Sequence, residues 1–298
     1  MNLPEMPQDV ASVCGVIVTY HPSSAKLMEL VDAIRPQLSS LIIVDNGSSF
    51  DFSGLTRQYD CEIVELGENF GIAHAQNAGI ERARERGTEF VLLLDQDSIP
   101  APDMVAQLVE AYRRLTATGA KVAAVGPSYV DPRQGEAAAF VYLDGLKLRR
   151  RERRGAEPVV EADFLIASGC LVPVAVLDEV GVMVDDLFID YVDIEWGLRA
   201  RRDGYLSYGV FDARMRHALG DERIKFGSRH VPAHGPVRHY YQVRNALWLA
   251  RLSWISVPWR FVLFLRVLQQ FAFFGLFAQN RLTHLKMMGL GFWHGLCG

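Results

Sequence analysis

The chain contains 298 residues, of which 50% are hydrophobic and 22% are charged, and its formal net charge is −4. This length suits one large α/β unit or a catalytic domain with an appendage, and the composition excludes a disordered or low-complexity chain. The four cysteines are widely spaced and form no C-x-x-C pair, which argues against a disulfide framework or a zinc site and favours a reducing, cytoplasmic setting. The first ten residues lack the basic and apolar segments of a secretory signal.

The first 130 residues alternate between apolar runs and helical stretches. Val13–Thr19 is a continuous apolar run of the kind that is buried on both faces of a sheet, and Ser23 and Ser24 are expected to cap the helix that follows through Ile34. The cycle repeats, with strands predicted at 41–45, 61–66 and Phe90–Asp95, a turn at 46–49 and a helix at 72–86. Because strands that are separated by helices run parallel, this half predicts a parallel sheet.

Shorter β segments are expected between Lys121 and Ile166, and the strongly basic stretch 147–154 among them is expected to form an exposed loop. A helix is predicted at 191–203 and a strand at 205–211. The sequence shows no internal repeat, and no Gly/Ser-rich or Pro-rich linker separates the two halves.

The C-terminal quarter differs from the rest in charge. Residues 223–298 contain ten Lys and Arg residues and no Asp or Glu, whereas residues 1–222 contain 21 basic and 35 acidic ones, so the tail carries +10 and the rest −14. The tail also holds four of the five tryptophans, namely Trp248, Trp254, Trp259 and Trp293. Basic and aromatic residues together favour an anionic membrane surface, and the apolar character of the tail disfavours nucleic acid.

A helix within residues 252–280 is expected to lie on a membrane rather than to cross it. Arg260 and Arg266 interrupt the apolar stretch, and its longest uncharged run, 267–280, has 14 residues, whereas a spanning helix needs about 20. On a helical projection, one half carries Arg266, Gln269 and Gln270, and the other half carries the apolar residues Phe261, Phe264, Leu265, Leu268, Phe271, Ala272 and Leu276. The alternative is a helix that packs on the protein's own core or on a second subunit.

Polar residues follow each of the first four predicted strands. They are Thr19-Tyr20-His21, Asp45-Asn46-Gly47-Ser48, Asn69-Phe70-Gly71 and Asp95-Gln96-Asp97-Ser98. Ligands bind at the carboxyl ends of the strands in an open parallel sheet, so these segments together predict a nucleotide site. The absence of a G-x-x-x-x-G-K-[ST] motif, and of G-x-G-x-x-G after the first strand, argues against a P-loop enzyme and a dinucleotide enzyme.

Asp95 and Asp97 stand two residues apart, and on an extended chain their carboxylates point to the same side. Together they are expected to hold Mg²⁺ or Mn²⁺, hard cations that prefer oxygen ligands and neutralise a leaving phosphate. The alternative is a pair of solvated or capping aspartates at a strand end.

Six stretches carry a resemblance to a known family. In chain order they are GVIVTYHP, LIIVDNGSS, ENFGIAHAQNAGIERA, LLLDQDSIP, ASGCLVP and FIDYVDIEWGLRARRDGY. Over about residues 13–253 the chain resembles family 2 glycosyltransferases with the GT-A fold, and it is most similar to bacterial rhamnosyltransferases that use dTDP-L-rhamnose. The resemblance implies a mostly parallel, Rossmann-like α/β sheet with a mixed acceptor-side half, and the charge and apolar pattern of the tail adds C-terminal amphipathic helices. It implies a GT-A catalytic domain at 1–225, with a nucleotide-sugar half at about 13–130 and an acceptor half at about 131–225. From its composition, the basic and aromatic-rich region at 226–298 is expected to be helical and to associate with a membrane or with a second subunit.

Carried over residue by residue, the resemblance implies a donor site and a metal site. Thr19 and Tyr20 are expected beside the base, and Asp45 is expected to accept a hydrogen bond from the base imide. The alternative role of Asp45 is to close an Asx turn from Asp45 to Ser48, and one side chain can serve both roles. The other residues that it implies for nucleotide-sugar binding are Asn69, Gly71, Asn77, Asp95, Ser168, Gly169 and Arg244, with the phosphate of a lipid-linked acceptor as the alternative partner of Arg244. The residues that it implies for the metal are Asp97, Asp95 and His217.

The general base is expected in the acidic stretch that starts the helix at 191–203. Asp193 stands where the family has the second residue of a Glu-Asp pair, and Val192 replaces the Glu, which leaves Asp190 and Glu195 as alternatives. A carboxylate opposite the leaving diphosphate can deprotonate the acceptor hydroxyl in a single, inverting displacement. The alternative is a purely structural role, in which Asp190, Asp193 and Glu195 form an acidic cluster that complements the dipole at the helix N-terminus.

These expectations predict an inverting sugar transfer, with L-rhamnose as the expected sugar, to a glycan or lipid-linked glycan in bacterial cell-surface polysaccharide synthesis. The enzyme is expected in the cytoplasm, peripheral on the inner face of the plasma membrane. The sequence does not decide whether it forms a homo-oligomer. LLLDQDSIP also resembles the first motif of haloacid-dehalogenase phosphatases, although three strands precede it here. A second rival function is that of a sugar nucleotidylyltransferase, and a third is that of a non-catalytic sugar-nucleotide-binding protein on the membrane.

Overall fold

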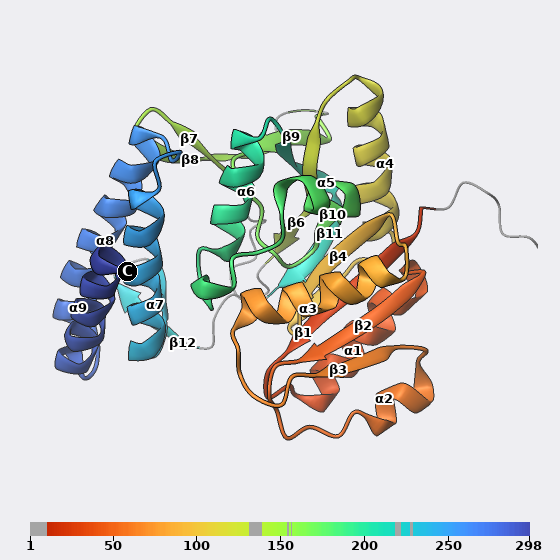
Figure 1. Ribbon diagram of the computed structural model, residues 1–298, viewed down its shortest axis with the longest axis horizontal. Helices are drawn as coiled ribbons and strands as arrows, with labels where there is room; N and C mark the ends of the chain where they lie inside the picture. Colours follow the sequence, from red (N-terminus) through yellow and green to blue (C-terminus); the bar gives the residue numbers. More distant parts are fainter. Residues whose placement is uncertain (1–10, 131–138, 154, 156, 218–221, 227–228) are drawn as a thin grey trace, which may run out of the picture.

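The computed structural model describes residues 11–130, 139–153, 155, 157–217, 222–226 and 229–298, with backbone alone at 222–226 and 229–233. A nine-stranded sheet forms its centre, in the order β3-β2-β1-β4-β10-β6-β11-β5, with β9 paired to β11. Helices cover both faces of the sheet, and three C-terminal helices stand together at one side (Figure 1). One apolar core lies between the sheet and α3, α5 and α6, and a second lies between the sheet and α1, α2 and α4.

The predicted parallel half is present. The strands β1 (Val13–Thr19), β2 (Ser40–Asp45), β3 (Glu62–Glu65) and β4 (Phe90–Asp95) are mutually parallel, and they alternate with α1 (Ser24–Ile34), η1 (Arg35–Gln37), α2 (Ser53–Gln58) and α3 (Ile72–Glu85). Thr19 is in register with Asp45, and Val18 with Asp95, so the polar strand ends meet at one edge. The prediction of a serine cap was wrong for Ser23, because its side chain makes no capping hydrogen bond.

The second half of the sheet is mixed. It contains β5 (Ser98–Pro100), β6 (Val122–Val130), β9 (Val159–Ala162), β10 (Cys170–Pro173) and β11 (Leu206–His217), with α4 (Met104–Ala117), α5 (Val174–Val180), η2 (Asp185–Leu187) and α6 (Val192–Arg202). The strand β10 runs antiparallel between β4 and β6. β11 continues beyond its predicted end at Phe211, and this extension pairs His217 with Ser98.

The basic stretch that was expected to form a loop is instead one strand of a hairpin. Strands β7 (Phe140–Asp144) and β8 (Lys147–Arg151) pair antiparallel. Leu143 and Leu148 pack against the cluster that contains Trp259, so this strand pair buries one apolar face. The charged side chains of β8 nevertheless stay exposed, which is why its sequence resembles that of a loop. Strands β12 (Glu222–Phe226) and β13 (Arg229–Ala233) form a second antiparallel pair.

The tail folds into α7 (Pro236–Arg251), α8 (Val257–Phe277) and α9 (Arg281–Cys297). These helices share a third apolar core with Tyr191, Ile194 and Leu198 at the start and middle of α6. Within the described residues, α8 is the one helix that is long and apolar enough to cross a membrane by length and composition. Its two arginines do not break the helix, since Arg260 donates to carbonyls of the preceding loop and Arg266 lies over the Tyr191 ring.

Candidate functional site

A cavity of about 690 Å³ opens at the carboxyl ends of β1 and β4, and α6, α7 and α8 form its other walls. Nine of the residues singled out from the sequence line it, namely Thr19, Tyr20, Asn69, Gly71, Asp95, Asp97, Asp190, Asp193 and His217. Six others lie outside its lining, namely Asp45, Asn77, Ser168, Gly169, Glu195 and Arg244. The cavity thus brings together residues from positions 19 to 217 of the chain.

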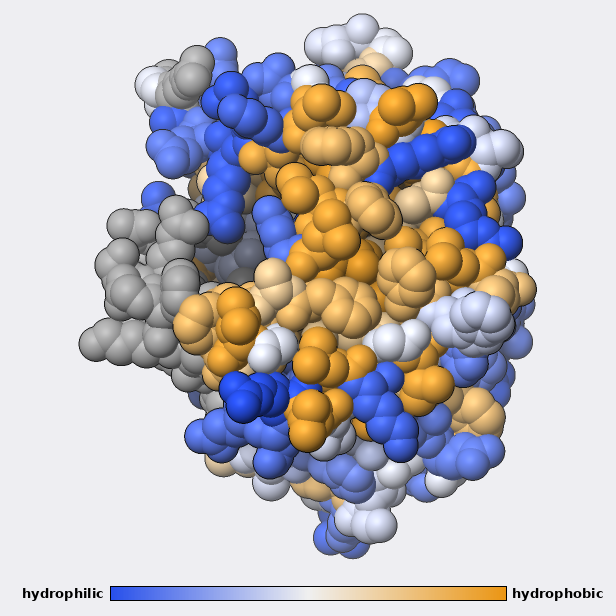
Figure 2. All heavy atoms as spheres, turned by 90° about the vertical axis from the view of Figure 1, so that its left-hand side faces the viewer, coloured by the Kyte–Doolittle hydropathy of each residue, from blue (hydrophilic) through white to orange (hydrophobic). Residues whose placement is uncertain are grey.

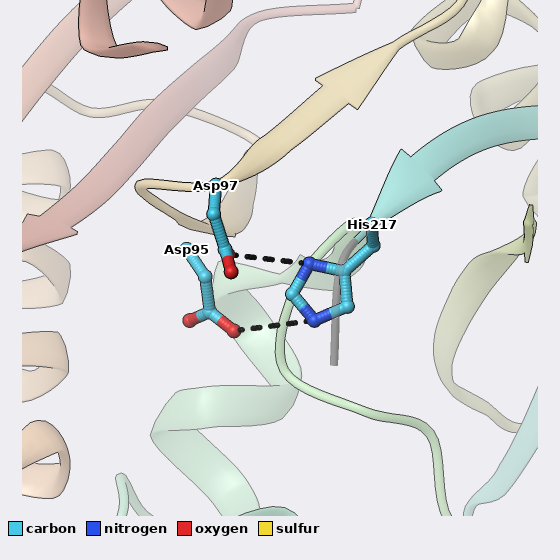
Figure 3. A group of neighbouring side chains, drawn as sticks. All are labelled: Asp95, Asp97 and His217. Carbon is cyan, nitrogen blue, oxygen red and sulfur yellow. Dashed lines mark ion pairs between the residues drawn. The ribbon is translucent and has the colours of Figure 1, made fainter. Parts of the chain in front are cut away.

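Asp95, Asp97 and His217 form a cluster whose candidate ligand atoms all lie within 4.8 Å of one another (Figure 3). His217 Nδ1 lies 3.4 Å from Asp97 Oδ1, and His217 Nε2 lies 4.0 Å from Asp95 Oδ2. The chain between the two aspartates turns rather than staying extended, which corrects the geometry expected from their spacing. Two carboxylates and an imidazole nevertheless make a donor set that fits Mg²⁺ or Mn²⁺.

Two buried serines hold this cluster in place. Ser98 Oγ lies 2.8 Å from His217 Nδ1 and 2.5 Å from Ser168 Oγ, and Ser168 Oγ also accepts a hydrogen bond from the Asp95 amide. Burial raises the pKa of Asp95, an effect that His217 opposes and Asp97 reinforces. A bound cation would reverse this shift, because it favours the carboxylate form.

The cavity wall at the ends of β1, β2 and β4 is supported by hydrogen bonds between these strand ends. Asp45 is buried, and it accepts hydrogen bonds from Thr19 Oγ1 at 2.9 Å and from both the amide and the hydroxyl of Ser48 at 2.6 Å. These bonds close the turn from Asp45 to Ser48, and the expected contact of Asp45 with the base stays a prediction. Gln96 in turn bonds both the amide and the carbonyl of Tyr20. These bonds fix the backbone of Tyr20, a residue that is 44% exposed.

Gly71 and Asn77 connect α3 to the segment 183–188, which contains η2. The φ of Gly71 is +90°, and a Cβ there would meet the backbone of Phe188 at 2.5 Å, so only glycine fits. Asn77 uses its carboxamide to bond both the amide and the carbonyl of Met183, and also Asp185. These contacts position the loop that leads to α6.

The loop before α6 is strained and clamped. Phe188, Asp190 and Tyr191 all have positive φ, between 62° and 67°, which is costly for residues with side chains and typical of functional sites. The Asn245 carboxamide donates to the carbonyls of Leu187, Ile189 and Asp190. Its neighbour Arg244 donates to the carbonyls of Asp186 and Leu187. This Arg-Asn pair therefore fixes the loop that carries the acidic residues.

The three candidate bases sit in different surroundings. Glu195 is buried and forms a two-point ion pair with Arg199 at 2.8 and 2.9 Å, and Asp190 forms another with Arg238 at 2.9 and 3.0 Å. Asp193 has no ion pair among the described residues. Burial raises its pKa to about 7, with smaller contributions from the charges of Asp190 and Asp95 and an opposing hydrogen bond from the Ile194 amide.

Several residues of the cavity were not predicted from the sequence. They are Gln76, Arg238, Gln242, Arg266 and Gln270. Their spacing in the sequence was the signal that could have found four of them. Arg238 and Gln242 stand one turn apart on one face of α7. Arg266 and Gln270 stand one turn apart on one face of α8. Part of the polar half of α8 thus faces the cavity. Among these residues, Gln76 and Gln270 each have a buried side-chain oxygen without a hydrogen-bond partner in the described part of the chain.

Comparisons with known proteins agree on one class. The family model described as glycosyl transferase family 2 matches residues 15–180. The chain is 34% identical over 250 residues to the dTDP-rhamnosyl transferase RfbF of Shigella flexneri, covering 83% of this chain and 82% of that protein.

Two solved structures share the fold at 13% identity. The first is S. aureus TarS 1-349 in complex with UDP-GlcNAc, with a TM-score of 0.61 and coverage of 94% of this chain and 80% of that one. The second is GalNAc-T7 with UDP, GalNAc and Mn²⁺, with a TM-score of 0.59 and coverage of 84% of this chain. The chain spans 53% of the GalNAc-T7 chain, so that comparison concerns the shared fold alone.

Proposed function

Since the chain belongs to glycosyltransferase family 2 and has the GT-A fold, we propose that it transfers L-rhamnose from dTDP-L-rhamnose to a hydroxyl group of a glycan, with inversion at the anomeric carbon. The choice of donor rests on the similarity to the Shigella flexneri enzyme. The observation that carries the mechanism is the placement of Asp193, which lines the same cavity as the Asp95–Asp97–His217 cluster.

The nucleotide binds at the ends of β1 to β4. The exposed Tyr20 ring offers the thymine a face on which to stack, because every base has a π-face. Asn69 and Gly71 form the adjoining wall, and Asp45 supports this wall through Thr19 and Ser48. The hydrogen bonds between Tyr20 and Gln96 keep this site formed before the donor arrives.

The diphosphate binds beside the metal cluster. Asp95, Asp97 and His217 would hold Mg²⁺ or Mn²⁺, which neutralises the charge that develops on the departing diphosphate. The two serines beneath the cluster fix the ring of His217 and the backbone of Asp95. The cluster is therefore ordered by the chain itself, which lowers the cost of organising it at each turnover.

Asp193 acts as the general base. It takes the proton of the acceptor hydroxyl while that oxygen forms its bond to the anomeric carbon and the bond to the diphosphate breaks. A pKa of about 7 matches this task, since the carboxylate is then both available and basic near neutral pH. Asp190 and Glu195 are less suited to this task because Arg238 and Arg199 already hold their oxygens.

The acceptor is a lipid-linked glycan that is met at the inner face of the plasma membrane. The exposed apolar side chains of α8 include Phe261, Phe264, Leu265 and Leu268, which are 38–49% exposed, and Leu276 at 68%. Figure 2 shows that hydrophobic residues form a continuous patch on the side of the molecule where α8 and α9 lie. Together with the charge of +10 on residues 223–298, this surface suits docking on an anionic bilayer.

A donor-turnover assay tests this function. The protein is incubated with dTDP-L-rhamnose, Mg²⁺ or Mn²⁺ and a lipid-linked glycan, and dTDP is quantified with and without the acceptor. We expect acceptor-dependent release of dTDP, and Asp193→Asn should suppress it while Glu195→Gln retains more. Release of inorganic phosphate instead would favour a phosphatase. Binding of the donor without turnover would favour a non-catalytic binding protein.

A further inference from the structure

The helix α8 has an exposed apolar face and a polar face that lines the cavity. Phe261, Leu265 and Leu268 are exposed on one side, whereas Arg266 and Gln270 line the cavity that holds the metal cluster and Asp193. Arg238 and Gln242 of α7 line the same cavity. The wall formed by α7 and α8 is thus polar on its inner side, and it faces residues that come from the sheet and from α6.

Arg266 supplies a cation to this wall. Its neighbour Arg238 is held by Asp190, and Arg260 of the same helix is held by backbone carbonyls. Across the part of the chain that the structure describes, Arg266 makes no ion pair, and its guanidinium lies 6.0 Å above the centre of the Tyr191 ring. A contact of this type leaves the N–H groups in the guanidinium plane able to bind an anion.

Gln270 supplies an unused acceptor one turn further along α8. Its Nε2 donates to Gln242 Oε1 at 2.8 Å, which fixes the orientation of the carboxamide. Its Oε1 is buried and has no partner among the described residues. A buried acceptor without a partner is costly, and Gln270, one turn from Arg266 on the cavity side of α8, can offer this oxygen to a hydrogen-bond donor of a ligand.

We propose that Arg266 and Gln270 form the acceptor subsite, in which Arg266 binds the phosphate that joins the lipid to the glycan and Gln270 accepts a hydrogen bond from a hydroxyl of the glycan. This inference rests on the proposed function and specifies its acceptor. A cation held by Asp95, Asp97 and His217 would balance the charge of the donor diphosphate. Arg266 is then available to bind a second anion. Because the opposite face of α8 meets the bilayer, the phosphate of a lipid-linked acceptor reaches this helix at the level of the lipid headgroups.

The test compares two acceptors that carry the same glycan, one on a lipid phosphate and one on an uncharged alkyl chain, both in neutral detergent micelles so that bilayer binding plays no part. For Arg266→Gln, we expect the KM of the phosphate acceptor to rise about 10- to 100-fold, as for a lost charge-assisted hydrogen bond. The KM of the alkyl glycoside and the KM of dTDP-L-rhamnose should stay within twofold of wild type. Arg266→Lys should restore part of the loss, since it keeps the charge.

Two further variants test the contribution of Gln270. Gln270→Leu should raise the KM of both acceptors and leave the KM of the donor unchanged, because the glycan is common to both. Gln269→Ala is the matched control on the same helix, since Gln269 is exposed and does not line the cavity, and it should behave as wild type. Unchanged melting temperatures will show that the variants fold.

The proposal is overturned if Arg266→Gln impairs both acceptors equally, if it raises the KM of the donor, or if the wild type does not distinguish the two acceptors. Failure of the wild type to turn over either acceptor would instead reject the proposed function itself.

Discussion

Replacing Asp193 by asparagine should stabilise the fold and destroy the activity at the same time. The pKa of the Asp193 carboxyl rises from 3.8 to about 7 on folding because the side chain leaves water. A raised pKa means that the native state favours the protonated form. The free energy of unfolding of the wild type therefore falls as the pH rises from about 4 to about 7 and this carboxyl ionises. Asparagine has no charge to desolvate, and its side-chain oxygen can still accept the hydrogen bond from the Ile194 amide.

The size of the effect follows from the shift. Each pKa unit corresponds to about 1.36 kcal/mol. Between pH 5 and pH 7, ionisation of Asp193 therefore lowers the free energy of unfolding of the wild type by at most about 3 kcal/mol. The side chain of Asp193 is half-buried at the cavity wall, and water in the cavity will reduce this figure. We therefore expect the stability advantage of Asp193→Asn over wild type to grow by about 1–3 kcal/mol between pH 5 and pH 8.5.

Urea unfolding at the two pH values, with EDTA present to keep the metal site empty, measures this difference. The kcat of the same variant should fall by about 10²–10⁴-fold, as for the loss of a general base. An advantage that is equal at both pH values, or a variant that is less stable than wild type at pH 8.5, would show that Asp193 is not desolvated. A kcat within a few-fold of wild type would assign the base to another residue.

Three further predictions concern other parts of the molecule. Asp97→Ala should abolish transfer, and EDTA should do the same to the wild type, whereas full activity in EDTA would remove the metal from the mechanism. Gln76→Leu should raise the melting temperature or leave it unchanged, because it removes a buried oxygen that has no partner among the described residues. Asn77→Leu on the same helix should lower the free energy of unfolding by about 1–3 kcal/mol, because it loses its bonds to Met183 and Asp185. Equal losses in the two variants would contradict this. Phe261→Glu with Leu265→Glu should release the protein from anionic vesicles, and high salt should weaken the wild-type binding only in part; a broken dimer or an unfolded chain would show that α8 packs against protein instead.

The parallel half of the sheet was predictable because its signals are local. Val13–Thr19 and Phe90–Asp95 are continuous apolar runs, and each borders a helical segment, so element type and direction both follow from the chain. The strand β10 was not predictable in the same way. It has four residues, and its antiparallel position between β4 and β6 depends on distant partners. The strand β8 was missed because its five residues are mostly arginine and lysine, which hid its pairing with β7.

The candidate site shows the same division. Asp95 and Asp97 were found because they follow an apolar strand, and His217 was found through the family resemblance. Its approach to Asp97 depends on the extension of β11 beside Ser98. The partners from the tail could not be foreseen, since the ion pair between Asp190 and Arg238 joins residues 48 positions apart. The position of Arg266 in the cavity wall was missed for a similar reason, because a helical projection shows which residues share a face but not what that face meets.

The anomeric configuration of the product tests the proposed mechanism most directly. The protein, Mg²⁺ or Mn²⁺, dTDP-L-rhamnose and a glycan acceptor are incubated, and the new linkage is examined by NMR together with the amount of dTDP released. We predict one dTDP for each rhamnose transferred and an anomeric configuration opposite to that of the donor, because Asp193 deprotonates the acceptor for a single displacement. A product that retains the configuration of the donor would contradict this mechanism.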